Sequence, residues 1–264
     1  MNIFLRELKA NRKSLLIWSF ITVLFIVAGF SKFTAYYGNP EMLAILDTFP
    51  PQVIEALDMN AFNLTTLVGF FGVMYLYFAL ILSIAAGMWG SDIITKEERD
   101  KTIEFALALP VKREKLITAK IAAVVVNCIL LALIATGTIV AVVQRYTPDA
   151  EFYRFMGLGM LAVFILQLIF MAIGVLLGCA MKKYKRAGST VVSLLLGTYI
   201  LSVVTDLNKN LEFLKYFSPF KYFDPVLLLR ESRFELPFVL LSVAIIALCL
   251  VGAYLTYARR DLYI

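Results

Sequence analysis

Charged side chains gather in one segment, residues 91–120, which reads SDIITKEERDKTIEFALALPVKREKLITAK and lies between two long apolar runs. Within it, Glu97 and Glu98 are adjacent carboxylates, a pair suited in principle to acid–base chemistry. A membrane-embedded protease that used paired glutamates would also need histidines, and this chain has none. We therefore expect the segment to act mechanically rather than catalytically.

The other residue types that carry chemistry are missing or badly spaced. The lack of histidine removes the commonest general base and metal ligand. Cys128, Cys179 and Cys249 lie in separate apolar runs without zinc-site or disulfide spacing, so we interpret each as a small buried hydrophobic residue. The chain also has no GxxxxGK[ST] phosphate loop. We expect no catalytic, cofactor-binding or metal-binding residue, so the chain is not an enzyme by itself.

The composition is that of an integral membrane protein. Of the 264 residues, 61% are hydrophobic and 17% charged, and the mean hydropathy is +0.83; a soluble domain has roughly 45–50% apolar residues. A helix needs about 20 apolar residues to cross a bilayer. Six stretches reach or approach that length, near residues 15–36, 64–91, 116–143, 154–181, 187–205 and 236–258. The sequence predicts an all-α membrane protein with a single transmembrane domain over residues 1–264.

Lysine and arginine are distributed unevenly between the two sides of this bundle. Six crossings place both termini on one side, together with the loops after the second and fourth spans, and 17 of the 25 basic residues fall on that side. Because basic residues are enriched in cytoplasmic loops, we expect both termini to be cytosolic. The same excess faces anionic lipid headgroups, which explains the pI of about 9.1 without a nucleic-acid partner.

Two segments outside the spans are expected to lie at the membrane surface. Residues 1–14 mix apolar and basic side chains, as in an amphipathic interfacial helix. The outer loop, residues 206–235, is rich in aromatic residues and broken by prolines, which predicts short re-entrant or interfacial helices. This loop could cap the exit of a pathway or could be an ordinary membrane-lying loop. The residues of such an outer gate would be Phe217, Pro219, Phe220, Tyr222 and Phe223.

The spans carry no Asp, Glu, Lys or Arg away from their ends, whereas ion-coupled transporters usually keep such residues near the midplane. The strongest polar groups are Asn127 and Gln167, supported by hydroxyls such as that of Thr198. Hydrogen bonds between helices would explain these residues as packing contacts. A role in lining a substrate pathway is the alternative. Any transport would then draw its energy from outside the bilayer, which implies a partner ATPase.

Residues 92–115 connect the second and third spans. Asp92 to Asp100 are expected to continue the second helix, after which Thr102 opens a short apolar helix that Pro110 ends. A stubby helix joined rigidly to two spans would let a partner tilt both spans together. The same residues could instead form an inert interfacial linker.

At these residues the chain resembles the permease subunits of ATP-binding-cassette transporters, in particular the type-2 family of six-span exporters. That family carries in this loop a glutamate-rich stretch, a Thr-[ILM]-Glu-x-x-Leu-x-x-Pro-[VIL]-x-[RK]-like run, and a lysine a few residues on. The matching positions here are Glu97, Glu98, Arg99, Thr102, Ile103, Glu104, Leu107, Pro110, Val111, Arg113 and Lys120. Lys101 stands where the family usually has glycine. The run from Phe217 to Phe223 also resembles a Ser-Pro-Phe stretch found before the last span of these permeases.

The resemblance implies two six-span permeases, identical or homologous, seated on two cytosolic ATPase subunits that bind the ATP and magnesium. The membrane would be the cytoplasmic membrane of a bacterium or archaeon. Residues 102–109 would form the coupling helix, and residues 1–14 the connecting helix beside it. The implied contacts with the ATPase are Glu97, Glu98, Arg99, Thr102, Ile103, Glu104, Phe105, Leu109 and Pro110.

The cargo is less constrained than the architecture. Spans without midplane charge favour an amphipathic or hydrophobic molecule, such as a peptide antibiotic, a drug or a lipid-like compound, and the resemblance favours export. An alternative is a membrane sensor that uses the same ATPase-linked scaffold to detect such a compound without moving it. Such sensors often carry a large folded outer domain, whereas the longest outer segment here has about 30 residues.

Overall fold

The computed structural model describes residues 3–39, 62–101, 111–207 and 209–259, and over these ranges the chain is helical and contains no strand. Six helices are long and apolar enough to cross a membrane, which confirms the predicted number of spans. They are α1 (Ile3–Tyr36), α3 (Leu67–Arg99), α5 (Arg113–Val143), α6 (Ala150–Ala180), α7 (Tyr184–Leu207) and α9 (Leu236–Arg259). Several are longer than the predicted apolar stretches. Hydropathy marks the part of a helix that matches the hydrocarbon, and not the turns that extend beyond it.

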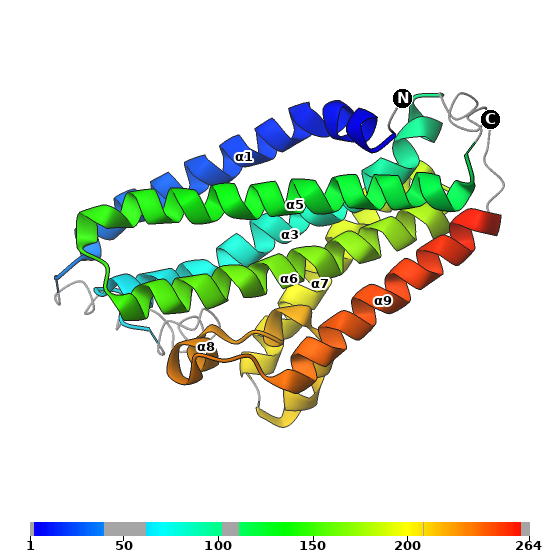
Figure 1. The fold of residues 1–264 in the computed structure, drawn as a ribbon. Helices are drawn as coiled ribbons and strands as arrows, with labels where there is room; N and C mark the ends of the chain where they lie inside the picture. Colours follow the sequence, from blue (N-terminus) through cyan, green and yellow to red (C-terminus); the bar gives the residue numbers. More distant parts are fainter. Residues whose placement is uncertain (1–2, 40–61, 102–110, 208, 260–264) are drawn as a thin grey trace.

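The start of α1 and the end of α9 lie at the same end of the bundle, beside the end of α3 and the beginning of α5 (Figure 1). This arrangement is the one that six crossings require. The amphipathic segment at the N-terminus shares one continuous helix with the first span, since α1 is unbroken from Ile3 to Tyr36.

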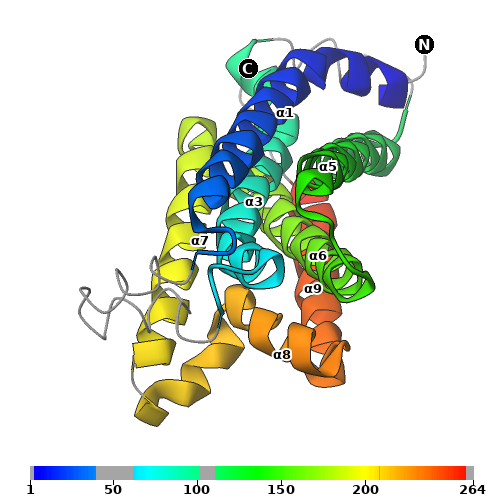
Figure 2. The ribbon, with the colours of Figure 1, turned by 90° about the vertical axis from the view of Figure 1, so that its left-hand side faces the viewer.

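Helices α3 and α6 form the centre of the bundle and make its most extensive contact. Figure 2 looks nearly along α5 and α6 and shows α3 between α7 on one side and α5 and α6 on the other. Both central helices run in the same direction, because Phe71 packs on Phe155 near their starts and Gly87 lies against Gly174 further along.

Small residues let these two helices approach closely. A Cβ atom added at Gly174 would lie 2.3 Å from the carbonyl oxygen of Gly87, and one added at Gly90 would lie 2.3 Å from that of Met171. At Gly178 an added Cβ would lie 3.0 Å from the carbonyl oxygen of Ser91. The Gly174-x-x-x-Gly178 pattern therefore faces a second set of small residues on α3, as in small-residue helix contacts within membranes.

The remaining spans surround this pair. Helix α1 packs mainly on α5, α9 packs on α6, and α7 packs on α3. Much of the outer surface of α1, α7 and α9 is apolar and exposed, which suits contact with lipid or with another membrane protein.

Three short helices fold the outer loop against this frame: η3 (Lys209–Phe217), η4 (Pro219–Lys221) and α8 (Pro225–Glu231). Helix α8 begins at a favourable cap, because the side chain of Asp224 accepts hydrogen bonds from the amides of Val226 and Leu227 and Pro225 occupies the first turn. They lie at the end of the bundle opposite the termini (Figure 1).

Candidate functional site

A buried cluster of charges joins three helices at the end of the bundle that holds the termini. The first turns of α1 supply Arg6 and Glu7, the last turns of α3 supply Lys96 and Glu97, and the second turn of α5 supplies Lys120. Local helix geometry explains each position, but the cluster exists only because three separate helix ends converge. We call these five residues the charge cluster.

Lys120 is the centre of the charge cluster. Its side chain is fully buried, and its Nζ lies 3.0 Å from Oε1 of Glu97 and 4.0 Å from Oε1 of Glu7. The amine also donates a hydrogen bond of 2.8 Å to the carbonyl oxygen of Ile93. A buried ammonium is stable only with such partners, so Lys120 fixes the position of α5 relative to α3.

The two carboxylates are shared with further cations. Arg6 Nη2 lies 3.2 Å from Oε1 of Glu7 and 3.4 Å from Oε1 of Glu97, and Lys96 pairs with the other oxygen of Glu7. Three cationic side chains therefore meet two anionic ones, which leaves one net positive charge. Each carboxylate bridges two helices, since Glu7 contacts residues of α3 and α5 and Glu97 contacts residues of α1 and α5.

Hydrogen bonds from other side chains also join the helices near the charge cluster. Trp89 Nε1 on α3 donates to Ser14 Oγ on α1 at 2.8 Å, about two turns deeper than the charge cluster. At the start of α5, Arg113 Nη1 donates to the carbonyl oxygen of Ala258 on α9 at 3.3 Å. The ends of α1, α3, α5 and α9 are thus held together.

Helix α3 ends immediately after the charge cluster, with a turn in which Lys101 adopts a φ of 55°. This left-handed backbone is the conformation that favours glycine at helix ends. It lies at the position where the resemblance leads us to expect glycine. The next expected contact residues, Thr102, Ile103, Glu104, Phe105, Leu109 and Pro110, lie outside the residues that the structure describes.

The other three expected contact residues occupy different environments. Glu97 and Glu98 are buried within the chain, whereas the side chain of Arg99 is 51% exposed. Arg99 pairs with Asp92 and Asp100. Asp92, Arg99 and Lys185 line a polar groove of about 330 Å³ between α3 and α7. Arg99 and this groove therefore offer accessible polar surface at the end of α3.

Asn127 and Gln167 both lie in the core of the bundle and are 1% and 0% exposed. Neither the oxygen nor the nitrogen of the Gln167 side chain, nor Nδ2 of Asn127, has a hydrogen-bond partner among the described residues. The parallel pairing of α3 and α6 places Ser83 level with Gln167. The Ser83 hydroxyl also has no hydrogen-bond partner among the described residues. Buried polar groups are rarely left in this state without a bound water or a functional reason.

Four of the five outer residues pack inward. Phe220 sits against Phe170 of α6 and Tyr199 of α7, with ring centroids 5.5 and 5.7 Å apart. Tyr222 stacks on Phe238 of α9 at 5.4 Å. Pro219 and Phe223 are also buried, whereas Phe217 is 68% exposed.

Hydrogen bonds fasten the same loop to the spans. Ser218 Oγ donates to the carbonyl oxygen of Thr198 on α7 at 2.7 Å, and Tyr222 Oη donates to that of Tyr216 at 2.6 Å. Burial raises the pKa of Tyr222 to about 12, so this hydroxyl keeps its proton at physiological pH. Thr198 is half-buried and bonds with its own helix through its hydroxyl, which donates to the carbonyl oxygen of Leu195.

Reasoning from the sequence missed Arg6, Glu7 and Lys96 as members of a site. Their charges were visible in amphipathic or highly charged stretches, where solvent or lipid headgroups are the usual partners. The one available signal was Glu7, an acidic residue within an otherwise basic first segment.

Comparison with known proteins agrees with this architecture. The sequence matches the ABC-2 family transporter proteins over residues 1–262. No curated protein matches the chain.

Proposed function

This chain belongs to the ABC-2 family of transporter proteins, and from that premise we propose that it is the transmembrane subunit of an ATP-driven exporter. Membership of this family makes it a membrane transport component that associates with an ATP-binding-cassette ATPase subunit. We assign ATP and magnesium to that partner, and the charged end of the bundle to the cytosolic side.

The observation that carries this proposal is the charge cluster. Lys120, Glu97 and Glu7 join α5, α3 and α1 near the end of α3 and the beginning of α5, the two helices that residues 102–110 connect in the sequence. An ATPase that moved this segment would displace the ends of α3 and α5, and α1 would follow because Glu7 and Arg6 are tied to both. The cluster thus offers a path by which force on one connection reaches three spans.

In the proposed assembly, two such permeases, identical or homologous, sit on two ATPase subunits in a bacterial or archaeal cytoplasmic membrane. Closure of the ATPases on ATP moves the pair between inward-open and outward-open states. Phe105 and Leu109 provide the apolar contact with the ATPase, and Arg99 with the neighbouring polar groove provides an accessible polar rim.

An amphipathic or hydrophobic molecule is the proposed cargo. The buried amide of Gln167 and Nδ2 of Asn127 lack hydrogen-bond partners among the described residues, which supports a place for polar cargo groups or water along the pathway. At the other end, inward packing of Phe220, Tyr222 and Phe223 supports a closed cap over that pathway.

The test uses the permease purified together with its ATPase subunit and reconstituted in lipid vesicles. The variant Phe105→Ala/Leu109→Ala should lower cargo-stimulated ATP hydrolysis at least several-fold, because it removes the apolar contact that couples the movement of the ATPase to the permease. The matched control is Leu130→Ala/Leu133→Ala, which truncates two exposed apolar residues of α5 elsewhere on the surface.

Equal ATPase stimulation in both variants and in the unaltered protein would overturn the assignment of the contact. Normal stimulation by the compound without its accumulation inside inverted vesicles would identify a sensor instead of an exporter.

A further inference from the structure

A half-open groove of about 460 Å³ lies between α1 and α3, in the half of the bundle away from the charge cluster. This volume is within the roughly 300–1,000 Å³ typical of small-molecule sites. One wall is a single stripe of α1 and the other is a stripe of α3 with the turn before it. The lining residues are Phe25, Ala28, Gly29, Lys32, Tyr36, Leu64, Phe70, Val73, Met74 and Tyr77.

The floor of the groove is a point of close contact between the helices. A Cβ atom added at Gly29 would lie 3.2 Å from the sulfur of Met74, so the backbone of α1 approaches α3 here. Aromatic contacts close the groove on either side, since Phe25 packs on Tyr77 at 6.3 Å and Phe30 on Phe70 at 5.4 Å. The walls are therefore apolar and preformed, with a length that follows the helices.

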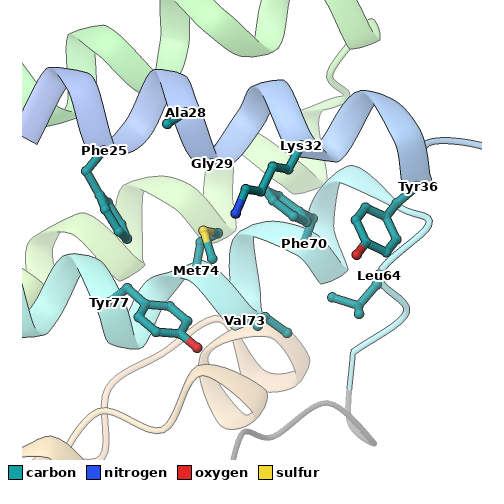
Figure 3. Close-up of a pocket in the computed structure, with 10 residues that line it drawn as sticks. All are labelled: Phe25, Ala28, Gly29, Lys32, Tyr36, Leu64, Phe70, Val73, Met74 and Tyr77. Atoms are coloured by element: carbon teal, nitrogen blue, oxygen red, sulfur yellow. The ribbon is translucent and has the colours of Figure 1, made fainter. Parts of the chain in front are cut away.

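Lys32 is the one charged residue among the lining residues in the part of the chain that the structure describes. Figure 3 shows its amine pointing back between the two helices toward Met74, and not toward the Tyr36 end of α1. A lysine near a helix end usually extends its amine toward the polar interface. This amine instead lies over the apolar groove, and because Lys32 is exposed, its ammonium can pair with an anion that enters from the open side.

Among the described residues that line this groove, none is acidic. The combination of apolar walls, an open side and one cation matches an amphiphile with a single anionic head. In a bilayer the abundant molecule of this kind is a phospholipid with an anionic headgroup, whose acyl chain can follow the apolar stripe while its phosphate meets the amine.

We infer that this groove is a binding site for an anionic phospholipid, with the phosphate at Lys32 and an acyl chain along Phe25, Val73 and Met74. The site lies apart from the charge cluster and involves no ATPase. If the test showed no lipid binding at this groove, the proposed transport function would be unaffected.

The test is native mass spectrometry of the full chain in detergent, with phosphatidylglycerol or phosphatidylcholine of identical acyl chains added as probes. The unaltered protein should retain phosphatidylglycerol about fivefold more strongly than phosphatidylcholine, the ratio that one basic residue near an anionic group contributes. Lys32→Met should abolish this preference and Lys32→Arg should keep it. Ala28→Trp, which fills the groove from an exposed position, should weaken retention of both lipids.

Arg145→Gln is the matched control, because Arg145 is an exposed basic residue at the same end of the bundle but is not among the lining residues. It should leave the preference unchanged. The inference is overturned if Lys32→Met retains the preference, if Arg145→Gln removes as much of it, or if the unaltered protein binds both lipids equally. Elution of each variant as a single folded species separates these outcomes from misfolding.

Discussion

Replacing Glu97 with glutamine tests whether the charge cluster holds the three helices together. The substitution preserves the shape of the side chain and removes its charge. Lys120, which is fully buried, would then keep only the carbonyl oxygen of Ile93 at 2.8 Å and the more distant Glu7 at 4.0 Å. The cluster would contain three cations and one anion.

The expected loss is large because the remaining charge cannot reach water. Breaking a buried ion pair by removing one partner costs about 3–5 kcal/mol of the free energy of unfolding. Lys120→Met should cost less, about 1–3 kcal/mol, since Glu97 would keep Arg6 at 3.4 Å and Arg6 is partly exposed. Glu97→Gln/Lys120→Met removes both charges, so its loss should fall short of the sum of the single losses by about 1–3 kcal/mol.

The assay is reversible unfolding of the four proteins in mixed micelles with a denaturing detergent. A second double-mutant cycle, with Asp92→Asn and Arg99→Met, provides the control, because that pair lies at the same end of α3 but is exposed. Its coupling should stay below about 1 kcal/mol. Equal couplings in the two cycles would show that the charge cluster does not hold the three helices together. The same conclusion would follow if Glu97→Gln lowered the free energy of unfolding no more than Lys120→Met.

Three further predictions concern the core and the outer cap. Gly174→Val should destabilise the bundle by about 1–3 kcal/mol, because the new side chain would collide with the Gly87 carbonyl. Gly157→Val is the control and should not destabilise it, since an added Cβ there meets nothing within 4 Å. Thermal unfolding in detergent compares the two variants. Gln167→Leu should leave stability equal or higher, since no described partner is lost, and should alter cargo selectivity in transport assays; a fall in stability would instead favour a packing role. Tyr222 has a pKa of 10.0 when exposed and about 12 in the fold, so stability should be lost as pH rises from 10 to 12, and the Tyr222→Phe variant should lack this loss in pH-dependent unfolding.

The six spans could be predicted because the apolar runs match the thickness of the hydrocarbon. The predicted continuation of the second span through its charged residues is confirmed, since α3 continues to Arg99, whereas hydropathy did not show that the first span begins as early as Ile3. Both extensions are charged, and it is the pairing of their charges that keeps them helical and packed. The partners of Gly174 and Gly178 on α3 are apparent only from the structure.

The charge cluster lay beyond prediction for a physical reason. Glu97 stands in a run of charges at the end of a span, where one helix viewed alone predicts exposure to solvent. Its neighbours in space, Lys120 and Arg6, are 23 and 91 positions away along the chain and belong to other helices. Only the convergence of three helix ends makes this carboxylate an internal link. Sequence reasoning identified Lys120 through a family pattern but had no basis for assigning its partner.

The arrangement of α1 relates the charge cluster to the groove at Lys32. Helix α1 packs mainly on α5, while α3 packs mainly on α6, so the bundle contains two closely packed pairs. At one end the pairs are clamped by Glu7, Arg6 and the bond from Trp89 to Ser14. At the other end the groove runs along the contact between α1 and α3, where Gly29 faces the side chain of Met74. Because helices move as nearly rigid rods, a displacement at the clamped end must change the width of the groove unless α1 bends. A lipid bound at Lys32 would therefore favour the displacement of the helix ends if it fits the groove better after the displacement. It would oppose the displacement if it fits the groove better before it.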